Sequence, residues 1–237
     1  MTFDQVGYNV RCEWGEHGVA LLAPVSDVVI VVDVLSFSTA VEIATCQGAV
    51  IFPYAWKDET AYEFAATVNA EVAGKENSNK YSLSSTSLLN LPSGVRLVLP
   101  SPNGSTLCLL AGSTPVIAGC LRNCRAVAEA AMSAGRTIAV IPAGERWKDG
   151  TLRPCLEDFI GAGAIIKFLR GTLSPEAVIA VSAFNTISGT LFDLLKGCSS
   201  GREKIFRGEE NDIRLAAELN VRDCVPVLRD GSFVRAT

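Results

Sequence analysis

Three short segments of the sequence place polar side chains directly behind apolar runs. The first joins Asp33 to Ser36, Ser38 and Thr39, after the apolar run 28–32. Backbone N–H groups at the start of a helix can hold an oxyanion, and hydroxyl groups add further donors. A carboxylate beside such a nest repels phosphate unless a cation lies between them. The alternative is helix capping, which accounts well for one of these residues and poorly for all four.

The second segment is a turn that follows the apolar run 95–99. It contains Asn103 and Gly104, a pair that is typical of tight turns whose backbone can approach a ligand, and Ser105 adds a hydroxyl group. A capped turn between a strand and a helix explains these residues equally well. Both interpretations of this segment stay open.

The third segment carries two adjacent carboxylates, Glu157 and Asp158, in the predicted first turn of a helix behind Pro154. Acidic residues there complement the positive end of the helix. Adjacent carboxylates also suit Mg²⁺, which binds one or two carboxylates together with waters and phosphate oxygens. Asp212 lies near the start of another predicted helix. We therefore expect Mg²⁺ as the cofactor, with Asp33, Glu157, Asp158 and Asp212 as its candidate ligands and the first three as catalytic candidates.

Such a metal site is compatible with the hydrolysis of a small phosphorylated acid. The hydroxyl and backbone groups of the first two segments would orient the phosphate oxygens. Arginine is the preferred partner of a second anionic group. The candidates for substrate binding are Ser36, Ser38, Thr39, Asn103, Gly104 and Ser105, together with Arg122, Arg146, Arg153 and Arg202.

Several other chemistries are excluded by residue type or spacing. His17 is the only histidine, so a zinc site with two histidines is impossible, and we expect its side chain to face solvent. The string 197–201 matches a Gly-x-Ser-x-Gly nucleophile motif, but no histidine follows it. No phosphate-binding P-loop sequence occurs, and the eight cysteines form no Cys-x-x-Cys pair. We interpret the cysteines as reduced packing residues.

Strand and helix patterns alternate along the chain and predict the elements that position these residues. This alternation indicates the α/β class, a three-layer α/β/α arrangement around a largely parallel or mixed sheet. Ligands bind beyond the carboxyl ends of the strands in such sheets. We expect one domain over 1–237, with two lobes as the alternative, and a loop over 77–90. The expected strands are 28–32, 49–54, 95–99, 116–118, 137–141, 225–228 and 233–235, and the expected helices are 36–47, 58–71, 101–110, 122–134, 154–169, 175–184, 188–195 and 209–219.

Composition narrows the classes of protein further. The 237 residues are 49% hydrophobic and 19% charged, which excludes intrinsic disorder and fibrous repeats. The net charge is −4, and a broad nucleic-acid surface needs clustered positive charge. No basic segment followed by an apolar run opens the sequence, so we expect no secretory signal, no membrane partner and a cytoplasmic location.

Taken together, these strings resemble the 2-phosphosulfolactate phosphatase family (ComB family). The resemblance implies a three-layer fold and a Mg²⁺-dependent hydrolase that converts 2-phospho-3-sulfolactate and water into 3-sulfolactate and phosphate, a step toward coenzyme M. The matching strings are Asp33-Val34-Leu35 with Ser38-Thr39, Asn103-Gly104-Ser105, Gly119 to Asn123, Ala143-Gly144, Leu156-Glu157-Asp158 with Ala162-Gly163-Ala164, Asn211-Asp212-Ile213 and Val225-Pro226.

One position departs from the pattern of that family. Where the family has an arginine after Asp-Val-Leu, this chain has Ser36, and a serine cannot replace the charge of an arginine. Two alternatives therefore stay open: a Mg²⁺-dependent phosphatase for another small phospho-acid, and a non-catalytic binder of a phosphorylated or sulfonated acid. We also expect a homodimer, because an apolar helix face serves a partner as well as a core.

Overall fold

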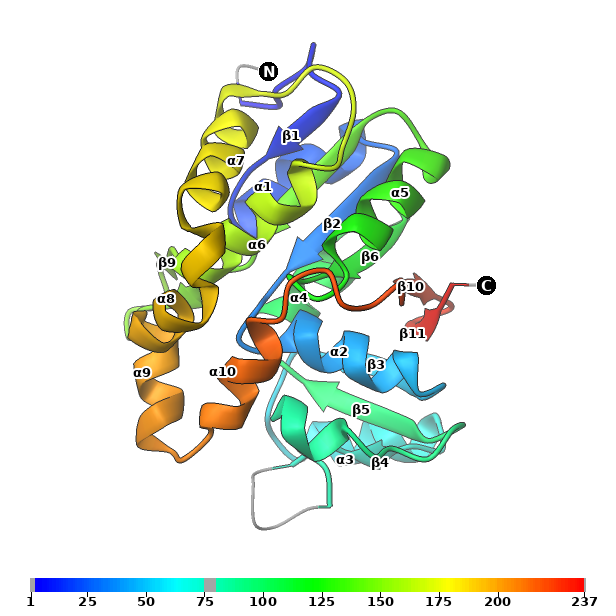
Figure 1. Cartoon of the computed structure of the whole chain (residues 1–237). Helices are drawn as coiled ribbons and strands as arrows, with labels where there is room; N and C mark the ends of the chain where they lie inside the picture. Colours follow the sequence, from blue (N-terminus) through cyan, green and yellow to red (C-terminus); the bar gives the residue numbers. More distant parts are fainter. Residues whose placement is uncertain (1–2, 75–79, 237) are drawn as a thin grey trace.

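The structure is a computed structural model that describes residues 3–74 and 80–236 (Figure 1). Its central feature is a mixed sheet of nine strands in the order β1-β7-β2-β6-β10-β11-β3-β5-β4, counted over the described residues. The strands are β1 (Val10–Cys12), β2 (Val28–Val32), β3 (Val50–Tyr54), β4 (Glu71–Val72), β5 (Arg96–Pro100), β6 (Val116–Gly119), β7 (Ile138–Pro142), β10 (Pro226–Arg229) and β11 (Ser232–Arg235), and a separate hairpin joins β8 (Glu145–Arg146) to β9 (Leu152–Arg153).

Helices cover both faces of this sheet. One face carries α1 (Gly15–Leu22), α2 (Phe37–Cys46), α4 (Gly104–Leu110) and the 3₁₀ turn η2 (Ser85–Leu88). The other face of the first half carries α5 (Cys124–Ala134), α6 (Leu156–Ile166) and α7 (Pro175–Ile187), followed by α8 (Leu191–Gly197), α9 (Ser199–Phe206) and α10 (Glu210–Ala216). Helix α3 (Thr60–Thr67) packs on Phe52 and Val98 of the outer strands.

The apolar runs of the sequence explain this layering. Along β2, Val29 and Val31 pack into the core under α1, α2 and α4, whereas Val28, Ile30 and Val32 pack under α5, α6 and α7. Successive side chains of a strand point to opposite faces, so a strand covered on both faces is apolar throughout. The predicted three-layer α/β/α fold is therefore confirmed.

The sheet consists of two parallel halves that run in opposite directions. Strands β1, β7, β2 and β6 are parallel to one another, as are β3, β5 and β4. Between the halves, β6, β10, β11 and β3 pair antiparallel in three successive steps, which reverses the strand direction. Strand twist accumulates across such a sheet, and Figure 1 shows the arrowheads of β2 and β5 pointing to the same side of the molecule. The carboxyl ends of β2 and β5 therefore lie close together, and the Gly104 N–H, which follows β5, reaches the carboxylate of Asp33, which follows β2.

Some elements were not predicted from the sequence. Strand β1 escaped because its central residue, Arg11, is charged, although the Arg11 guanidinium is buried and donates to the backbone carbonyls of Tyr8 and Val25. Helices α1 and α9 and the β8–β9 hairpin were also missed. The helix expected over 58–71 ends at Thr67, because the chain then enters β4. Of the predicted loop 77–90, residues 77–79 lie outside the described part, and the remainder contains η2.

The helical stretch from Pro175 to Gly197 is 23 residues long and has a mean hydropathy of 1.5 over its most apolar window. By length and composition alone it could cross a membrane, and about a fifth of it, 22%, is buried. Its inner face packs closely on α6: a side chain in place of Gly163 would lie 2.1 Å from the Ala180 carbonyl oxygen. The expected absence of a membrane partner stays a prediction.

Candidate active site

Asp33 joins the two halves of the sheet at the carboxyl end of β2. One carboxylate oxygen, Oδ1, accepts a hydrogen bond from the Phe37 N–H at 3.0 Å, and Oδ2 accepts one from the Gly104 N–H at 3.1 Å. The carboxylate thus meets the first N–H groups of both α2 and α4, which helix termini leave without partners. A side chain in place of Gly104 would lie 2.3 Å from the Phe37 ring, so only glycine permits this approach.

Asp158 holds the same loop from the side of β7. Its Oδ1 accepts from the Val34 N–H at 2.8 Å, and its Oδ2 accepts from the Gly144 N–H at 2.9 Å. Gly144 has a φ of +68°, a conformation that favours glycine. The two aspartates are therefore anchored on both sides of the segment 33–37, where helices leave neighbouring strands toward opposite faces of the sheet. Ligand sites in open α/β sheets form at such points.

Asp33 and Asp158, the acid pair of this site, lie in surroundings that disfavour their negative charge. Burial raises the pKa of Asp33 to about 7, and repulsion from Glu145 and Glu157 adds to this effect against the opposing Phe37 and Gly104 hydrogen bonds. Burial also raises the pKa of Asp158 well above its usual range, together with repulsion from Asp33 and Glu157. Neither carboxylate bonds to a lysine or arginine among the described residues. Such a cluster favours a cation.

The cluster fits Mg²⁺ as a two-carboxylate site. Within residues 3–74 and 80–236, no three His, Cys, Asp or Glu side chains converge into a ready-made cage for an ion. Mg²⁺ commonly takes only one or two protein carboxylates, and water and substrate phosphate fill its other positions. Asp33 and Asp158, with buried Glu157 beside them, satisfy that requirement.

The predicted hydroxyl donors hold the loops together. The Ser38 hydroxyl accepts from the Asp33 N–H at 3.0 Å and donates to the Val31 carbonyl at 3.1 Å. The Thr39 hydroxyl donates to the Val34 carbonyl at 2.8 Å, and the Ser105 hydroxyl donates to the Leu99 carbonyl at 3.1 Å. All three hydroxyl side chains are fully buried. Their partners here are the backbone of the site, and the expectation that they orient phosphate stays a prediction.

Ser36 and Asn103 stand at the entrances of α2 and α4. Ser36 is buried and immediately precedes α2, and Asn103 is half-buried and immediately precedes α4. Neither side chain caps its helix, because Asp33 occupies that role for both. Capping, the alternative interpretation of these segments, therefore holds for Asp33 and not for the serines.

Two of the predicted arginines lie outside the site. Arg122 is buried and forms an ion pair of 2.7 Å with Glu42, a second ion pair with Glu218 and a hydrogen bond to the Leu215 carbonyl. Its guanidinium therefore ties α5 to α2 and α10. Arg202 is exposed on α9.

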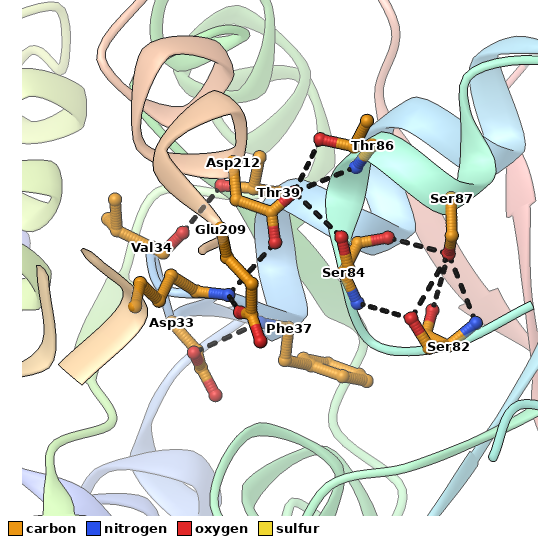
Figure 2. Close-up of polar contacts among 11 residues, drawn as sticks. Asp33, Val34, Phe37, Thr39, Ser82, Ser84, Thr86, Ser87, Glu209 and Asp212 are labelled. Carbon is orange, nitrogen blue, oxygen red and sulfur yellow. Dashed lines mark hydrogen bonds and ion pairs between the residues drawn. The ribbon is translucent and has the colours of Figure 1, made fainter. Parts of the chain in front are cut away.

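Asp212 pairs with a cation of the protein itself (Figure 2). Its Oδ2 lies 2.9 Å from the Lys204 ammonium, and its Oδ1 accepts from the Ser84 hydroxyl and from both the N–H and hydroxyl groups of Thr86. Burial opposes ionisation, but Lys204 and Thr86 hold the pKa of Asp212 below its ordinary value. This carboxylate is thus engaged in fastening segment 82–88 to α9 and α10, in contrast to the expected role as a Mg²⁺ ligand.

A cavity of about 460 Å³ is lined by the neighbours of the residues that bind the acid pair: Asn103 precedes Gly104, and Ala143 precedes Gly144. It is bounded by α1, the start of α4 and the β8–β9 hairpin. His17 is exposed, as predicted, but it also lines this cavity. Sequence reasoning missed Glu145 and all of α1, although Glu145 directly follows the Ala-Gly turn at the end of β7. The lining residues include Trp14, Glu16, His17, Asn103, Leu107, Glu145, Arg146 and Leu152.

The two remaining arginines lie on the β8–β9 hairpin. Arg146 lines the cavity and forms an ion pair with Glu16 of α1. Arg153 is half-buried and donates to the Ser200 hydroxyl at 3.2 Å, near the Trp147 ring. The site therefore brings together Asp33, Asp158, Glu157, Asn103, Gly104 and Arg146 and leaves Arg122 and Asp212 in separate ion pairs.

Comparison with known proteins identifies the family. Residues 20–231 match the family described as 2-phosphosulpholactate phosphatase. The 2-phosphosulfolactate phosphatase of Methanothermobacter thermautotrophicus is 32% identical over 135 residues, which are 57% of this chain and 57% of that protein. A probable 2-phosphosulfolactate phosphatase of Carboxydothermus hydrogenoformans is 29% identical over 220 residues, 87% of this chain and 89% of that protein.

A third relative, a probable 2-phosphosulfolactate phosphatase of Caldanaerobacter subterraneus, is 26% identical over 217 residues, 86% of this chain and 88% of that protein. These names describe a phosphoric monoester hydrolase. The family match extends from α1 to the turn between β10 and β11 and includes the segments that form the acid pair. The chain therefore belongs to the 2-phosphosulpholactate phosphatase family.

Proposed function

We propose that this chain is a Mg²⁺-dependent 2-phosphosulfolactate phosphatase. The reaction would convert 2-phospho-3-sulfolactate and water into 3-sulfolactate and phosphate, which is a step in the biosynthesis of coenzyme M. The observation that supports it best is the buried Asp33–Asp158 pair, which is anchored by four backbone N–H groups and lacks a cationic partner among the described residues. Family membership supports the substrate.

Asp33 and Asp158, with Glu157, are the residues that would hold Mg²⁺. Bound there, the ion would supply the positive charge that draws the phosphate oxygens to the acid pair and stabilises the charge of phosphoryl transfer. The backbone N–H bonds fix both carboxylates before substrate arrives, so little reorganisation is needed at the moment of reaction.

A buried carboxylate beside the attacking water can also accept a proton from it. In the proposed reaction, water attacks phosphorus as the bond between phosphorus and the ester oxygen breaks. One water proton passes to the carboxylate and from it to the ester oxygen, which leaves as the hydroxyl group of sulfolactate, while the hydroxide oxygen of the water stays on phosphorus. Leu35 stands where a second aspartate would follow Asp33 in phosphatases that form an aspartyl phosphate, which favours attack by water over attack by Asp33.

The test is phosphate release from synthetic 2-phosphosulfolactate with Mg²⁺ and with chelator. We expect phosphate release in the presence of Mg²⁺ and none in the presence of chelator. Asp33→Asn and Asp158→Asn should each lower kcat by at least about 100-fold, because the contribution of a general base alone reaches roughly 10²–10⁴-fold. Asp193→Asn, an exposed carboxylate on α8, is the matched control. Near-normal turnover by the Asp33→Asn enzyme would exclude the assigned role.

Ser36 supports one second candidate, a phosphatase for a different small phospho-acid. This residue is buried at the entrance of α2 and brings no charge to the site. A panel containing phosphoglycolate and phospholactate beside 2-phosphosulfolactate separates the two candidates by kcat/KM. Ser36→Arg should raise the preference for doubly anionic substrates if the charge at this position selects them.

A further inference from the structure

The cavity beside the acid pair has the position and lining of a site for the remainder of a substrate. Glu145 contributes to its wall and is close enough to Asp33 to repel its charge. Asn103 also lines it and directly precedes Gly104, whose N–H binds Asp33. A substrate whose phosphate lies at the acid pair would therefore extend its carbon skeleton into this cavity.

Arg146 is the lining residue that can bind a second anionic group. Its guanidinium pairs with Glu16, and about two fifths of each side chain is exposed, 43% and 42%. Half-exposed ion pairs are weak because solvent screens them. By contrast, Arg122 is buried between Glu42 and Glu218 and cannot be released without leaving buried charges unpaired.

The hairpin fixes where the Arg146 guanidinium can reach. Its Nη1 donates to the Gly150 carbonyl at 3.2 Å, within the hairpin turn. Leu152 of the opposite strand packs against α1: a side chain in place of Gly15 would lie 3.2 Å from its methyl group. Hairpin and helix are thus packed together, and the Arg146–Glu16 pair spans them at the rim of the cavity.

We propose that Glu16 and the sulfonate of the substrate compete for Arg146, so that this pair selects for substrates that carry a sulfonate. In the free protein, Glu16 occupies the guanidinium. The sulfonate of the substrate replaces it in the cavity, and the Glu16 carboxylate turns to solvent. Arginine suits this role because its planar guanidinium binds such groups through two parallel hydrogen bonds. The substrate class rests on the proposed function, but the competition for Arg146 is a binding property that can be measured without turnover.

Calorimetric titration with 3-sulfolactate and with lactate, which lacks the sulfonate, tests the competition directly. Glu16→Gln removes the competitor and keeps the shape of the side chain, so 3-sulfolactate should bind roughly 3- to 10-fold more tightly, the size expected for loss of a half-exposed pair. Arg146→Met should weaken 3-sulfolactate binding by at least about 10-fold, as for loss of a charge-assisted hydrogen bond. Lactate binding should change by less than about 2-fold in both variants. Arg202→Met, an exposed arginine on α9, is the matched control.

Steady-state kinetics separates this inference from the proposed function. If phosphate is released, Arg146→Met should raise KM for 2-phosphosulfolactate and leave kcat within about 3-fold, and it should leave KM for phospholactate, which has no sulfonate, unchanged. Sulfolactate binding that depends on Arg146 in a protein without phosphatase activity would support the inference while the proposed function fails. Equal effects on 3-sulfolactate and lactate, no effect of either variant, or no binding of 3-sulfolactate by the wild type would overturn it.

Discussion

The Asp33 carboxylate has two tasks that make opposite demands on its charge. As the shared cap of α2 and α4 it is most effective when ionised, because negative charge complements the positive end of a helix. As a buried neighbour of Asp158, Glu145 and Glu157 it resists ionisation, and burial dominates. The balance places its pKa near neutral pH, where a bound cation or a substrate can decide whether the proton stays.

This balance predicts an unusual pH dependence of stability. Burial raises the pKa of Asp33 from 3.8 to about 7, so the folded protein retains a proton between these pH values that the unfolded chain has lost. The contribution of Asp33 to the free energy of unfolding is therefore fully present below about pH 4 and is lost as the pH rises through 7. Urea unfolding between pH 4 and 8 in chelator should show this decline, and Asp33→Asn should make it smaller, because the raised pKa of Asp158 contributes a decline of the same sign.

An asparagine at position 33 also changes the hydrogen bonds to α2 and α4, and so changes the free energy of unfolding at every pH. The effect of the pKa shift is therefore isolated by comparing how steeply the free energy of unfolding changes with pH in each protein. Asp193→Asn provides the matched slope for an exposed aspartate. Parallel pH profiles for the wild type and the Asp33→Asn protein would contradict the assigned pKa shift.

At the scale of secondary structure, the close approach of α4 to the β2–α2 turn depends on a missing side chain. Gly104→Ala would place a methyl group 2.3 Å from the Phe37 ring and 2.8 Å from the Asp33 carboxylate. Because this region is packed core, α4 must shift, and we expect a loss of about 1–3 kcal/mol in the free energy of unfolding. Activity should fall as well, because the N–H bond to Asp33 is displaced.

Gly189→Ala is the control for this substitution, since nothing lies within 4 Å of an added methyl group there. We expect it to change stability by no more than about 0.5 kcal/mol. A Gly104→Ala protein of wild-type stability in urea unfolding would show that α4 does not need this approach.

The strands and the acid pair were largely predictable from the sequence, whereas their partners were not. Apolar runs such as 28–32 identify buried strands locally, and polar residues after them are expected at the carboxyl edge of the sheet. Strand order, the reversal between the two halves and the buried partners of Ser38 and Thr39 depend on contacts between distant segments. Strand β1 was not predicted for a related reason. Its Arg11 is buried because its guanidinium donates to two backbone carbonyls, and these carbonyls come close to it only in the folded protein.

At the scale of the whole molecule, one buried ion pair joins segments that are far apart in the sequence. Lys204 lies 2.9 Å from Asp212 and 2.7 Å from Glu209, and Asp212 accepts hydrogen bonds from segment 82–88 (Figure 2). This cluster fastens the C-terminal helices to the wall formed by η2 and α2.

Removal of the Lys204 ammonium from this cluster should lower the free energy of unfolding. Lys204→Met leaves Asp212, which is 1% exposed, without its counter-charge, and breaking a buried pair in this way typically costs about 3–5 kcal/mol. Lys196→Met is the control, because Lys196 pairs with Glu210 on the surface and should contribute less than about 1 kcal/mol. Urea unfolding of the two variants measures the difference, and equal losses would refute a special role for the buried pair.

The β10–β11 hairpin connects the halves of the sheet with one residue pair on each side, Val227 with Ile117 and Phe233 with Ile51, whereas the ladders within each half are longer. The hydrogen bond from the Gly104 N–H to Asp33 spans this seam, because Asp33 follows a strand of one half and Gly104 follows a strand of the other. Because strand pairing joins the two halves so sparsely, this hydrogen bond is also part of what holds them in register. A substitution that breaks it would therefore disturb the fit of one half against the other as well as the position of one carboxylate.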